Sequence, residues 1–510
     1  MRALAPGFRP YQWAATTADV AHIAGIDASQ VLRFDQNTPA LPLPSTRPGT
    51  VAGALARVNG YPGGGYVPLR RAIADYAGVE PENIVLGVGA DDLILLCARA
   101  YAGPGDTIAI PAAPTYPLYE IAAQLAGADV GHEDAALTFA CRPNNPTGAL
   151  EPLPDARPLV VDEAYYEYSG ETVVGLTADE EVIVLRTFSK LFGLAGERVG
   201  YAIARRDIAD ELNARQAPAP VSTVAAELAI AALASRPDPR PEIEERERLA
   251  SAFRALGLEP LESHTNFLYV PVDDGIELGD ALIRQGIVVR AYPQAIRASV
   301  RDAADDDLLV EALARVLDRP APVASAGHRR VRVVRATAET RLATRLGLDG
   351  ASRVRVATGA GLYDHFLEQL AFHAGFDLIL EGAGDLETGD HHTAEDAALA
   401  LGAALDRALG DRRGIARYGD AVVPMDDALA RAAVDLGGRA NSEITLEHDP
   451  GLAEHMLSSF AQAARASIHV QATGRDAHHV AEAAFKALGR ALRSAVRLES
   501  DGLPSTKGLL

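Results

Sequence analysis

The motif His-His-x-x-Glu occurs twice in this chain, and each copy opens a stretch rich in alanine and leucine. The first copy is DHHTAEDAALALGAALDRAL from Asp390, and the second is DAHHVAEAAFKALGRALRSA from Asp476. An acidic residue followed by histidine precedes both copies, as Asp364-His365 and as Glu454-His455. A helix and then a strand are expected between this dipeptide and the motif in both cases. An internal duplication explains such a repeat better than chance does.

The motif carries ligands that are typical of a metal site. Glu395 follows His391 by four residues and His392 by three, so a helix can bring these side chains to one face. Imidazole and carboxylate suit a borderline divalent ion such as Mn, Fe, Co or Zn, and the absence of thiolate argues against structural zinc. Paired histidines at a helix start can also simply cap or solvate the helix. Two copies, each with an upstream histidine, favour a duplicated metal site.

The length of the chain requires more than one domain. A chain of 510 residues is expected to hold about two to four domains. The segment RPAPVASAGH, residues 319–328, has the composition of a linker, so we predict domains at residues 1–318 and 329–510. Before the linker, apolar runs such as ENIVLGVGA and VIVLRTFSK alternate with helical stretches, which predicts an α/β fold with a mostly parallel sheet. After it, the repeat predicts an α+β domain of two duplicated halves.

Charge and cysteine content limit the partners and the compartment. The formal net charge of -21 opposes binding to a phosphate backbone, so no nucleic-acid partner is expected. Cys97 and Cys141 cannot build a disulfide framework and show no zinc-binding spacing, which favours a reducing compartment. We find no leader-like apolar segment at the N-terminus and no apolar run that could cross a bilayer. A cytoplasmic protein without a membrane partner is therefore expected.

The C-terminal part resembles imidazoleglycerol-phosphate dehydratase of histidine biosynthesis from about residue 330 onward. The motifs that carry the resemblance are RATAET, DHF, GDHHTAED, RYG, PMDDAL, DLGGR, HHVAEAAFKALGRALR and STKG. That family has two similar α+β halves and binds two Mn²⁺ ions per active site, with ligands shared between subunits. The resemblance implies metal ligands at His365, His391, His392, Glu395, His455, His478, His479 and Glu482.

The same resemblance assigns roles in a dehydration. Glu339 matches the family's general acid/base, although a solvated carboxylate would be the ordinary interpretation of a lone glutamate on a strand. Gln369 matches a position that contacts the substrate. A phosphate dianion requires charge-assisted donors. The implied phosphate ligands are Arg417, Arg439, Lys486, Ser505 and Lys507.

In the first part, RTFSKLFGLAGERVGY places Lys190 at a strand end, before glycine-rich turns and an arginine. This arrangement fits a lysine that forms a Schiff base beside a phosphate cradle, although Ser-Lys alone is a weak signal. Asp162, in VVDEAYYEY, could pair with a protonated pyridine nitrogen. Tyr165 could reach a phenolic oxygen, Asn145 lies in RPNNPTG, and Tyr116 in PTYPLY offers a ring for stacking. GVGADD, between a strand and a helix, would offer backbone N–H groups to a phosphate.

Together these segments resemble a fold-type I pyridoxal-phosphate aminotransferase, and within that group histidinol-phosphate aminotransferase, over most of residues 30 to 315. The resemblance implies a mostly parallel sheet with a small C-terminal subdomain. It makes Lys190 catalytic, places Asp162 on the pyridinium, and places Asn145 and Tyr165 at the phenolic oxygen. The remaining implied positions are Ser189, Arg198, Gly89, Ala90 and Asp91 at the cofactor phosphate, Tyr116 at the ring, Tyr61 from a dimer partner, and Arg290 and Arg297 at the substrate's anionic groups.

This half also departs from its family. RPNNPTG stands where the family has NPNNPTG, DQNTP stands for NENP, and Ala90 replaces a serine in the phosphate turn. The intervals from Tyr116 to Asn145 and from Asn145 to Asp162 are short for the family, so a peripheral helix or two is expected to be missing. Specificity is affected more than cofactor binding, because the cofactor-contacting residues are retained.

The two resemblances together predict a bifunctional enzyme. It would dehydrate imidazoleglycerol phosphate to imidazoleacetol phosphate and transaminate that product with glutamate to histidinol phosphate, using pyridoxal 5'-phosphate and two Mn²⁺ per dehydratase site. A homo-oligomer is expected, because aminotransferases form dimers and the dehydratases form shells built from trimers. The alternatives are an active dehydratase fused to an aminotransferase of different or lost specificity, and a metal-binding assembly without catalysis. A regulator would need a basic helix-turn-helix, which this acidic chain does not show.

Overall fold

The computed structural model describes residues 8, 10–26, 28–39, 48–322, 329–349, 352–499 and 502–504. The chain divides into two compact units, one made of residues 1–302 and 308–322 and the other of residues 303–307 and 323–510. Part of the predicted linker lies outside the described residues, and so do Ser505 and Lys507. Among the helices that are described, none is long and apolar enough to span a membrane.

The N-terminal unit is built on a seven-stranded sheet in the order β4-β3-β5-β6-β7-β8-β2, in which only β8 runs antiparallel to its neighbours. Its central strands are short apolar runs that are buried on both faces, as expected for a parallel sheet covered by helices. This confirms the predicted mostly parallel sheet. The strands are β2 (Ile84–Gly87), β3 (Thr107–Ala109), β4 (Asp129–Val130), β5 (Leu137–Cys141), β6 (Leu159–Asp162), β7 (Val182–Thr187) and β8 (Gly200–Ile203).

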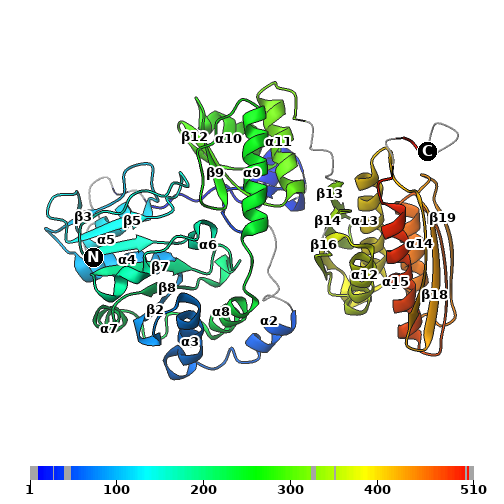
Figure 1. Cartoon of the computed structure of the whole chain (residues 1–510), viewed down its shortest axis with the longest axis horizontal. Helices are drawn as coiled ribbons and strands as arrows, with labels where there is room; N and C mark the ends of the chain where they lie inside the picture. Colours follow the sequence, from blue (N-terminus) through cyan, green and yellow to red (C-terminus); the bar gives the residue numbers. More distant parts are fainter. Residues whose placement is uncertain are drawn as a thin grey trace. The chain divides into compact units, whose positions relative to one another are not determined.

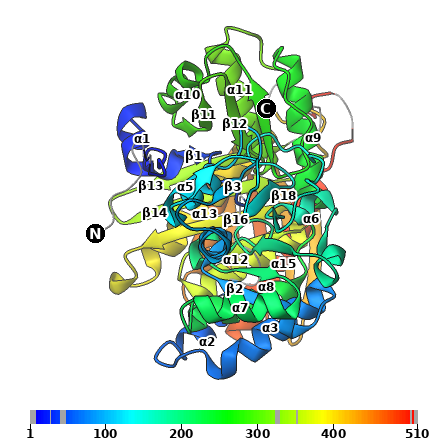
Figure 2. The same cartoon turned by 90° about the vertical axis from the view of Figure 1, so that its left-hand side faces the viewer.

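Helices cover both faces of this sheet. Figures 1 and 2 place α2, α3, α7 and α8 together at one end of the unit. The helices of this part are α1 (Thr17–Ala24), α2 (Pro48–Leu55), α3 (Val67–Ala77), α4 (Gly89–Tyr101), α5 (Leu118–Ala126), α6 (Tyr166–Ser169), α7 (Arg206–Arg215) and α8 (Thr223–Ser235).

A smaller subdomain lies at the other end of the unit. Its antiparallel sheet has the order β11-β12-β9, and α9, α10 and α11 lie together beside it (Figures 1 and 2). A further short strand, β1 (Leu32–Arg33), pairs in parallel with β10 (Ile287–Val288). The small C-terminal subdomain expected from the sequence is thus present. Its other elements are β9 (Phe267–Pro271), β11 (Arg290–Tyr292), β12 (Ala295–Ser299), α9 (Arg240–Ala255), α10 (Gly275–Ile283) and, from residue 308 onward, α11 (Ala303–Val316).

The C-terminal unit contains two four-stranded sheets with the same strand order. One is β13-β14-β16-β15 and the other β17-β18-β20-β19, and in each the last pair alone is parallel. Strands such as β18 alternate buried and exposed residues, because one face packs on helices and the other faces outward. The strands are β13 (Arg330–Ala336), β14 (Thr340–Gly347), β15 (Val354–Ala357), β16 (Asp377–Gly384), β17 (Tyr418–Met425), β18 (Ala428–Asp435), β19 (Asn441–Leu446) and β20 (Ser467–Thr473).

Four helices fill the space between these two sheets (Figure 1) and share one hydrophobic core. Helix α12 (Gly361–Ala374) packs on α15 (Ala477–Ala495), and α13 (His391–Leu409) packs on α14 (Ala453–Ala463). Glycines allow the close approach. A Cβ at Gly402 would lie 2.5 Å from the carbonyl oxygen of Phe460, and one at Gly489 would lie 2.4 Å from that of Leu370. Each helix pair therefore joins one half of the repeat to the other.

Candidate functional sites

The pairing of α12 with α15 brings together a first group of metal-ligand types. The ligand atoms of His365, His478 and Glu482 all lie within 4.8 Å of one another. The two imidazole rings are nearly parallel, at 9°, with centroids 5.6 Å apart. Glu482 Oε2 lies 3.7 Å from His365 Nε2 and 3.3 Å from His478 Nε2. We call this group the α12/α15 triad.

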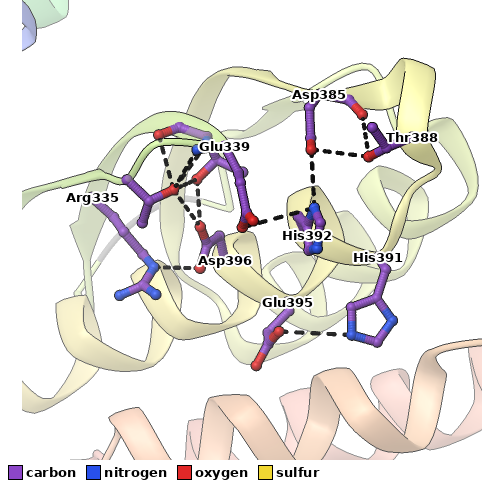
Figure 3. Close-up of polar contacts among 10 residues, drawn as sticks. Arg335, Glu339, Asp385, Thr388, His391, His392, Glu395 and Asp396 are labelled. Carbon is purple, nitrogen blue, oxygen red and sulfur yellow. Dashed lines mark hydrogen bonds and ion pairs between the residues drawn. The ribbon is translucent and has the colours of Figure 1, made fainter.

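The pairing of α13 with α14 builds a second group of the same kind. His391, Glu395 and His455 have their ligand atoms within 4.8 Å of one another. Glu395 Oε2 lies 3.8 Å from His391 Nε2, one helical turn away (Figure 3), and Glu395 Oε1 lies 3.5 Å from His455 Nε2. In this α13/α14 triad, as in the first, the motif of one half meets the upstream histidine of the other half.

The chemistry of both triads fits a borderline divalent cation. Two imidazoles and one carboxylate are the donors that Mn, Fe, Co or Zn accept. Three ligands from one chain leave coordination positions open for water, a substrate or a residue of another copy. The residues present are thus compatible with the metal that the sequence led us to expect.

The second histidine of each motif faces away from its triad. His392 Nδ1 lies 3.0 Å from Asp385 Oδ2 (Figure 3), and His479 Nδ1 lies 2.7 Å from Asp427 Oδ1. These hydrogen bonds raise the pKa of both imidazoles above the ordinary value. Within this chain His392 therefore faces Asp385 rather than Glu395. The assignment of His392 and His479 as metal ligands stays a prediction.

Glu339 lies in the turn between β13 and β14, beside the first motif. Its Oε2 is 3.8 Å from His392 Nδ1 (Figure 3), and its side chain is half exposed. Two hydrogen bonds stabilise the turn: Thr337 Oγ1 accepts from the backbone N–H groups of Glu339 and Thr340 at 3.2 and 2.9 Å. These bonds fix the backbone of the turn, and the half-exposed Glu339 carboxylate lies at the edge of the motif, beside His392.

Two of the predicted phosphate ligands, Lys486 and Arg417, have carboxylate partners in this chain. Lys486 Nζ lies 2.8 Å from Glu482 Oε1, and Arg417 binds Asp435 through two contacts of 2.7 and 3.0 Å. Arg439 is exposed. Gln369 is half-buried on α12, one turn after the metal-ligand histidine of that helix. The phosphate-binding and substrate-contacting roles of these residues stay predictions.

In the N-terminal unit, Asp162 ends β6 as a buried carboxylate without an arginine or lysine bound to it among the described residues. Its oxygens accept from the Tyr119 hydroxyl at 2.7 Å and from the backbone N–H of Ala164 at 3.0 Å. Burial raises the pKa of Asp162 to about 6. Burying a negative carboxylate without a positive partner costs free energy, and a protonated pyridine nitrogen would supply that positive partner. The site thus fits the cofactor that the sequence predicts.

Lys190 follows β7 and points toward the same region. Its Nζ lies 5.4 Å from the centroid of the Tyr165 ring. Burial, together with the positive charge of Arg297, lowers the pKa of Lys190 to about 8. With a pKa of about 8, roughly a tenth of the Lys190 amine is neutral at pH 7, far more than for an ordinary lysine, and only the neutral amine attacks a carbonyl.

Tyr165 and the bonded pair of Arg297 and Asn145 lie near this lysine. The Tyr165 hydroxyl accepts from Asn37 Nδ2 at 2.9 Å, and Arg297 donates to Asn145 Oδ1 at 2.5 Å. Arg297 also donates to the backbone carbonyl of Asp35 at 2.7 Å, while its buried Nε has no hydrogen-bond partner among the described residues. The structure therefore brings three of the predicted residues together beside Lys190.

The predicted phosphate cradle lies at the start of α4. Gly89, the first residue of that helix, has φ 78°, and a Cβ there would lie 2.8 Å from an Arg198 nitrogen. Arg198 donates to Asp91 Oδ2 at 3.1 Å, and the Tyr116 hydroxyl donates to Asp91 Oδ1 at 3.0 Å. Because the Asp91 carboxylate is negative, only its backbone N–H, like that of Ala90, suits a phosphate. A helix N-terminus with an adjacent arginine is a favourable place for an anion.

Three further predicted residues have different surroundings. Ser189 is buried, and its hydroxyl accepts from Thr187 at 3.0 Å. Tyr61 is 92% exposed, which leaves its ring available to another copy of the chain. Arg290 donates to the backbone carbonyl of Gln12 at 3.2 Å and lies 5.8 Å from the Tyr11 ring. The substrate-gripping role of Arg290 stays a prediction.

Sequence reasoning did not identify Tyr119, Asn37, Asp385 and Asp427. Tyr119 is the second tyrosine of PTYPLY, and Asn37 belongs to DQNTP, so both lie in segments that were recognised. Asp427 lies in PMDDAL and binds the second histidine of a motif. In the sequence, the one sign that such a residue matters is that it is polar and lies close to a residue of a motif. Only the tertiary contact identifies its partner.

In comparisons with known proteins, the two units match different families. The family model for imidazoleglycerol-phosphate dehydratase matches residues 358–492. A protein of that name from Salinispora arenicola is 48% identical over 204 residues, covering 36% of this chain and 99% of the relative. Another, from Methanothermobacter thermautotrophicus, is 48% identical over 190 residues, covering 36% and 98%.

The family model for class I and II aminotransferases matches residues 29–316. The crystal structure of histidinol-phosphate aminotransferase from Sinorhizobium meliloti with pyridoxal 5'-phosphate is 26% identical, with a TM-score of 0.54, and covers 60% of this chain and 95% of that chain. The Clostridium acetobutylicum histidinol-phosphate aminotransferase is 23% identical, with a TM-score of 0.51 over 56% of this chain and 99% of that chain, and shares the fold.

Proposed function

This chain belongs to the class I and II aminotransferases through its N-terminal unit and to the imidazoleglycerol-phosphate dehydratases through its C-terminal unit, and from this premise we propose two consecutive reactions on one polypeptide. The C-terminal unit dehydrates imidazoleglycerol phosphate to imidazoleacetol phosphate. The N-terminal unit then transfers an amino group from glutamate to that ketone and forms histidinol phosphate. We assign the transferase to residues 1–318 and the dehydratase to residues 329–510.

The observation that carries the dehydratase assignment is that each triad is assembled from both halves of the repeat. Mn²⁺ ions held by the two triads would supply positive charge to the imidazole ring of the substrate while the hydroxyl leaves. Glu339 is the group that moves the proton, through its Oε2. His392, 3.8 Å away, and Asp385 behind it orient that carboxylate.

The surroundings of Lys190 support the transferase assignment. Pyridoxal 5'-phosphate supplies the electron sink for the exchange of amino group and ketone. Asp162 holds the ring nitrogen, Tyr165 and Asn145 orient the phenolic oxygen, and the N-terminus of α4 with Arg198 binds the phosphate. Lys190 Nζ takes the proton from one carbon atom and delivers it to another. Arg297 holds an anionic group of the amino donor.

A product analysis tests both reactions together. Purified protein receives imidazoleglycerol phosphate, Mn²⁺ and pyridoxal phosphate, and the products are identified by mass spectrometry with and without glutamate. We expect imidazoleacetol phosphate without glutamate and histidinol phosphate with it. A Lys190→Ala variant should stop at the ketone, and a Glu339→Gln variant should lose the first step while still converting added imidazoleacetol phosphate.

Each negative result addresses one part of the proposal. If imidazoleacetol phosphate accumulates even with glutamate, the N-terminal unit serves another substrate. If a Lys190→Ala variant still transaminates, Lys190 is not the catalytic lysine. Metal binding without any turnover would instead favour a non-catalytic metal-binding assembly.

A further inference from the structure

The two triads occupy matching positions in the repeat, yet the residue one turn beyond each glutamate differs. Lys486 follows Glu482 by four residues on α15, whereas Leu399 follows Glu395 by four residues on α13. The side chains of Lys486 and Glu482 are only 16% and 9% exposed, and Nζ lies 2.8 Å from Oε1. Lys486 Nζ also contacts Met425 Sδ at 3.2 Å, which holds the ammonium group against the carboxylate.

The next turn extends the difference in charge. Arg490 stands four residues beyond Lys486, while its counterpart on α13 is Ala403. Positive side chains thus follow Glu482 along its helix at two successive turns, and apolar side chains follow Glu395. The two halves offer the same three ligands in different electrostatic surroundings.

The lysine also changes how many carboxylate oxygens face a metal. Glu482 directs Oε2 toward the two histidines of its triad, and its Oε1 is taken by Lys486. Glu395 directs Oε1 toward one histidine of its triad and Oε2 toward the other. A cation in the α13/α14 triad can therefore approach both oxygens of its glutamate. A cation in the α12/α15 triad can approach one.

We propose that the two triads bind divalent cations unequally, with the α12/α15 triad the weaker, and that Lys486 is the positioning residue that sets the difference. An ammonium group that neutralises the only carboxylate of a triad opposes a divalent cation there. One such charge near a protein surface is sufficient to change a dissociation constant by about tenfold or more. The proposal rests on the proposed function in taking the triads as Mn²⁺ sites.

Mn²⁺ binding to the metal-free, full-length protein tests this inference without any assay of turnover. Free Mn²⁺ is followed by electron paramagnetic resonance during a titration at constant pH. We expect two classes of site, with dissociation constants at least about tenfold apart. His365→Ala should abolish the weaker class, and His455→Ala should abolish the tighter one.

The repeat provides matched variants for the role of the lysine. Lys486→Met should bring the weaker class to within about threefold of the tighter class, whereas Lys486→Arg, which keeps the charge, should preserve the separation. Leu399→Lys places the cation in the other half and should weaken the tighter class. Circular dichroism checks the fold of that variant, and Lys486→Met alone suffices if it does not fold.

The outcomes separate this inference from the proposed function. Two classes of equal affinity in the unaltered protein, or a separation that persists in Lys486→Met, would overturn the inference and leave the metal-dependent function standing. Loss of the tighter class in His365→Ala would overturn the assigned order. No Mn²⁺ binding at all would overturn both.

Discussion

Replacing Tyr119 by phenylalanine tests how the N-terminal unit keeps Asp162 ionised. The Tyr119 hydroxyl donates to Asp162 Oδ2 at 2.7 Å, and its ring, which is fully buried, stacks on Phe139. Phenylalanine preserves the ring and removes only the donor. The pKa of Asp162 is already raised to about 6 by burial, so the carboxylate depends on its remaining hydrogen bonds.

The size of the effect follows from the strength of that bond. A hydrogen bond to a charged group contributes about 1.5–3 kcal/mol, and one pKa unit corresponds to about 1.4 kcal/mol. Its loss should raise the pKa of Asp162 by about one to two units, to about 7–8. At pH 7 the ionised fraction of Asp162 would then fall from roughly nine-tenths to about half or less.

Equilibrium dialysis of pyridoxal 5'-phosphate across a range of pH measures this shift. Because the ring nitrogen is proposed to pair with ionised Asp162, affinity should fall as the pH drops through the pKa of that carboxyl group. The midpoint should move upward in Tyr119→Phe. In Tyr116→Phe it should stay in place, since Tyr116 donates to Asp91. An unchanged midpoint in Tyr119→Phe would refute the reasoning.

Three further predictions concern stability and site assembly. Arg186→Met should destabilise the protein by about 3–5 kcal/mol in urea unfolding, because it leaves the negative charge of Glu163 buried without a partner; the two side chains are 3% and 1% exposed. Arg205→Met breaks an exposed ion pair, so this control should leave the unfolding midpoint nearly unchanged. Gly402→Ala should lower the free energy of unfolding by about 1–3 kcal/mol, because the added methyl group overpacks the contact between α13 and α14. It should weaken Mn²⁺ binding at the α13/α14 triad alone, and equal weakening of both triads in an electron paramagnetic resonance titration would contradict this. Asp162→Asn should remove a pH dependence of the cofactor-free protein. Between about pH 4 and 6 the folded state retains the Asp162 proton and the unfolded state releases it, so the free energy of unfolding of the unaltered protein falls by about 3 kcal/mol as the pH rises through that window. Over the same range of pH, the melting temperature of Asp162→Asn should change less than that of the unaltered protein.

The fold was largely predictable because its signals are local. Apolar runs such as those of β5, β6 and β7 lie between helical stretches, and together they indicate a mostly parallel sheet. The repeated motif predicted two similar halves, and both halves have the same strand order. The order of strands within each sheet depends on contacts between distant residues, and the sequence pattern does not contain it.

Prediction of the site was less complete, for the same reason. Lys190, Asp162, Tyr165 and Asn145 were found because they lie in three recognisable motifs, with Asp162 and Tyr165 sharing VVDEAYYEY. Asn37 and Tyr119 were missed, because their importance lies in a hydrogen bond to a residue far along the chain. Lys486 was predicted as a phosphate ligand, and its proximity to Glu482 on the same helix became informative only when the contact was seen.

The sequence by itself determined which residues could act as metal ligands and that His391 and Glu395, four residues apart on a helix, would face the same way. That relation follows from the pitch of an α-helix and needs no other part of the molecule. The tertiary structure alone decided that each such pair meets the upstream histidine of the other half, and that His392 faces Asp385. Close helix packing at Gly402 and Gly489 brings about the first of these contacts, because it determines which surfaces of distant segments come together.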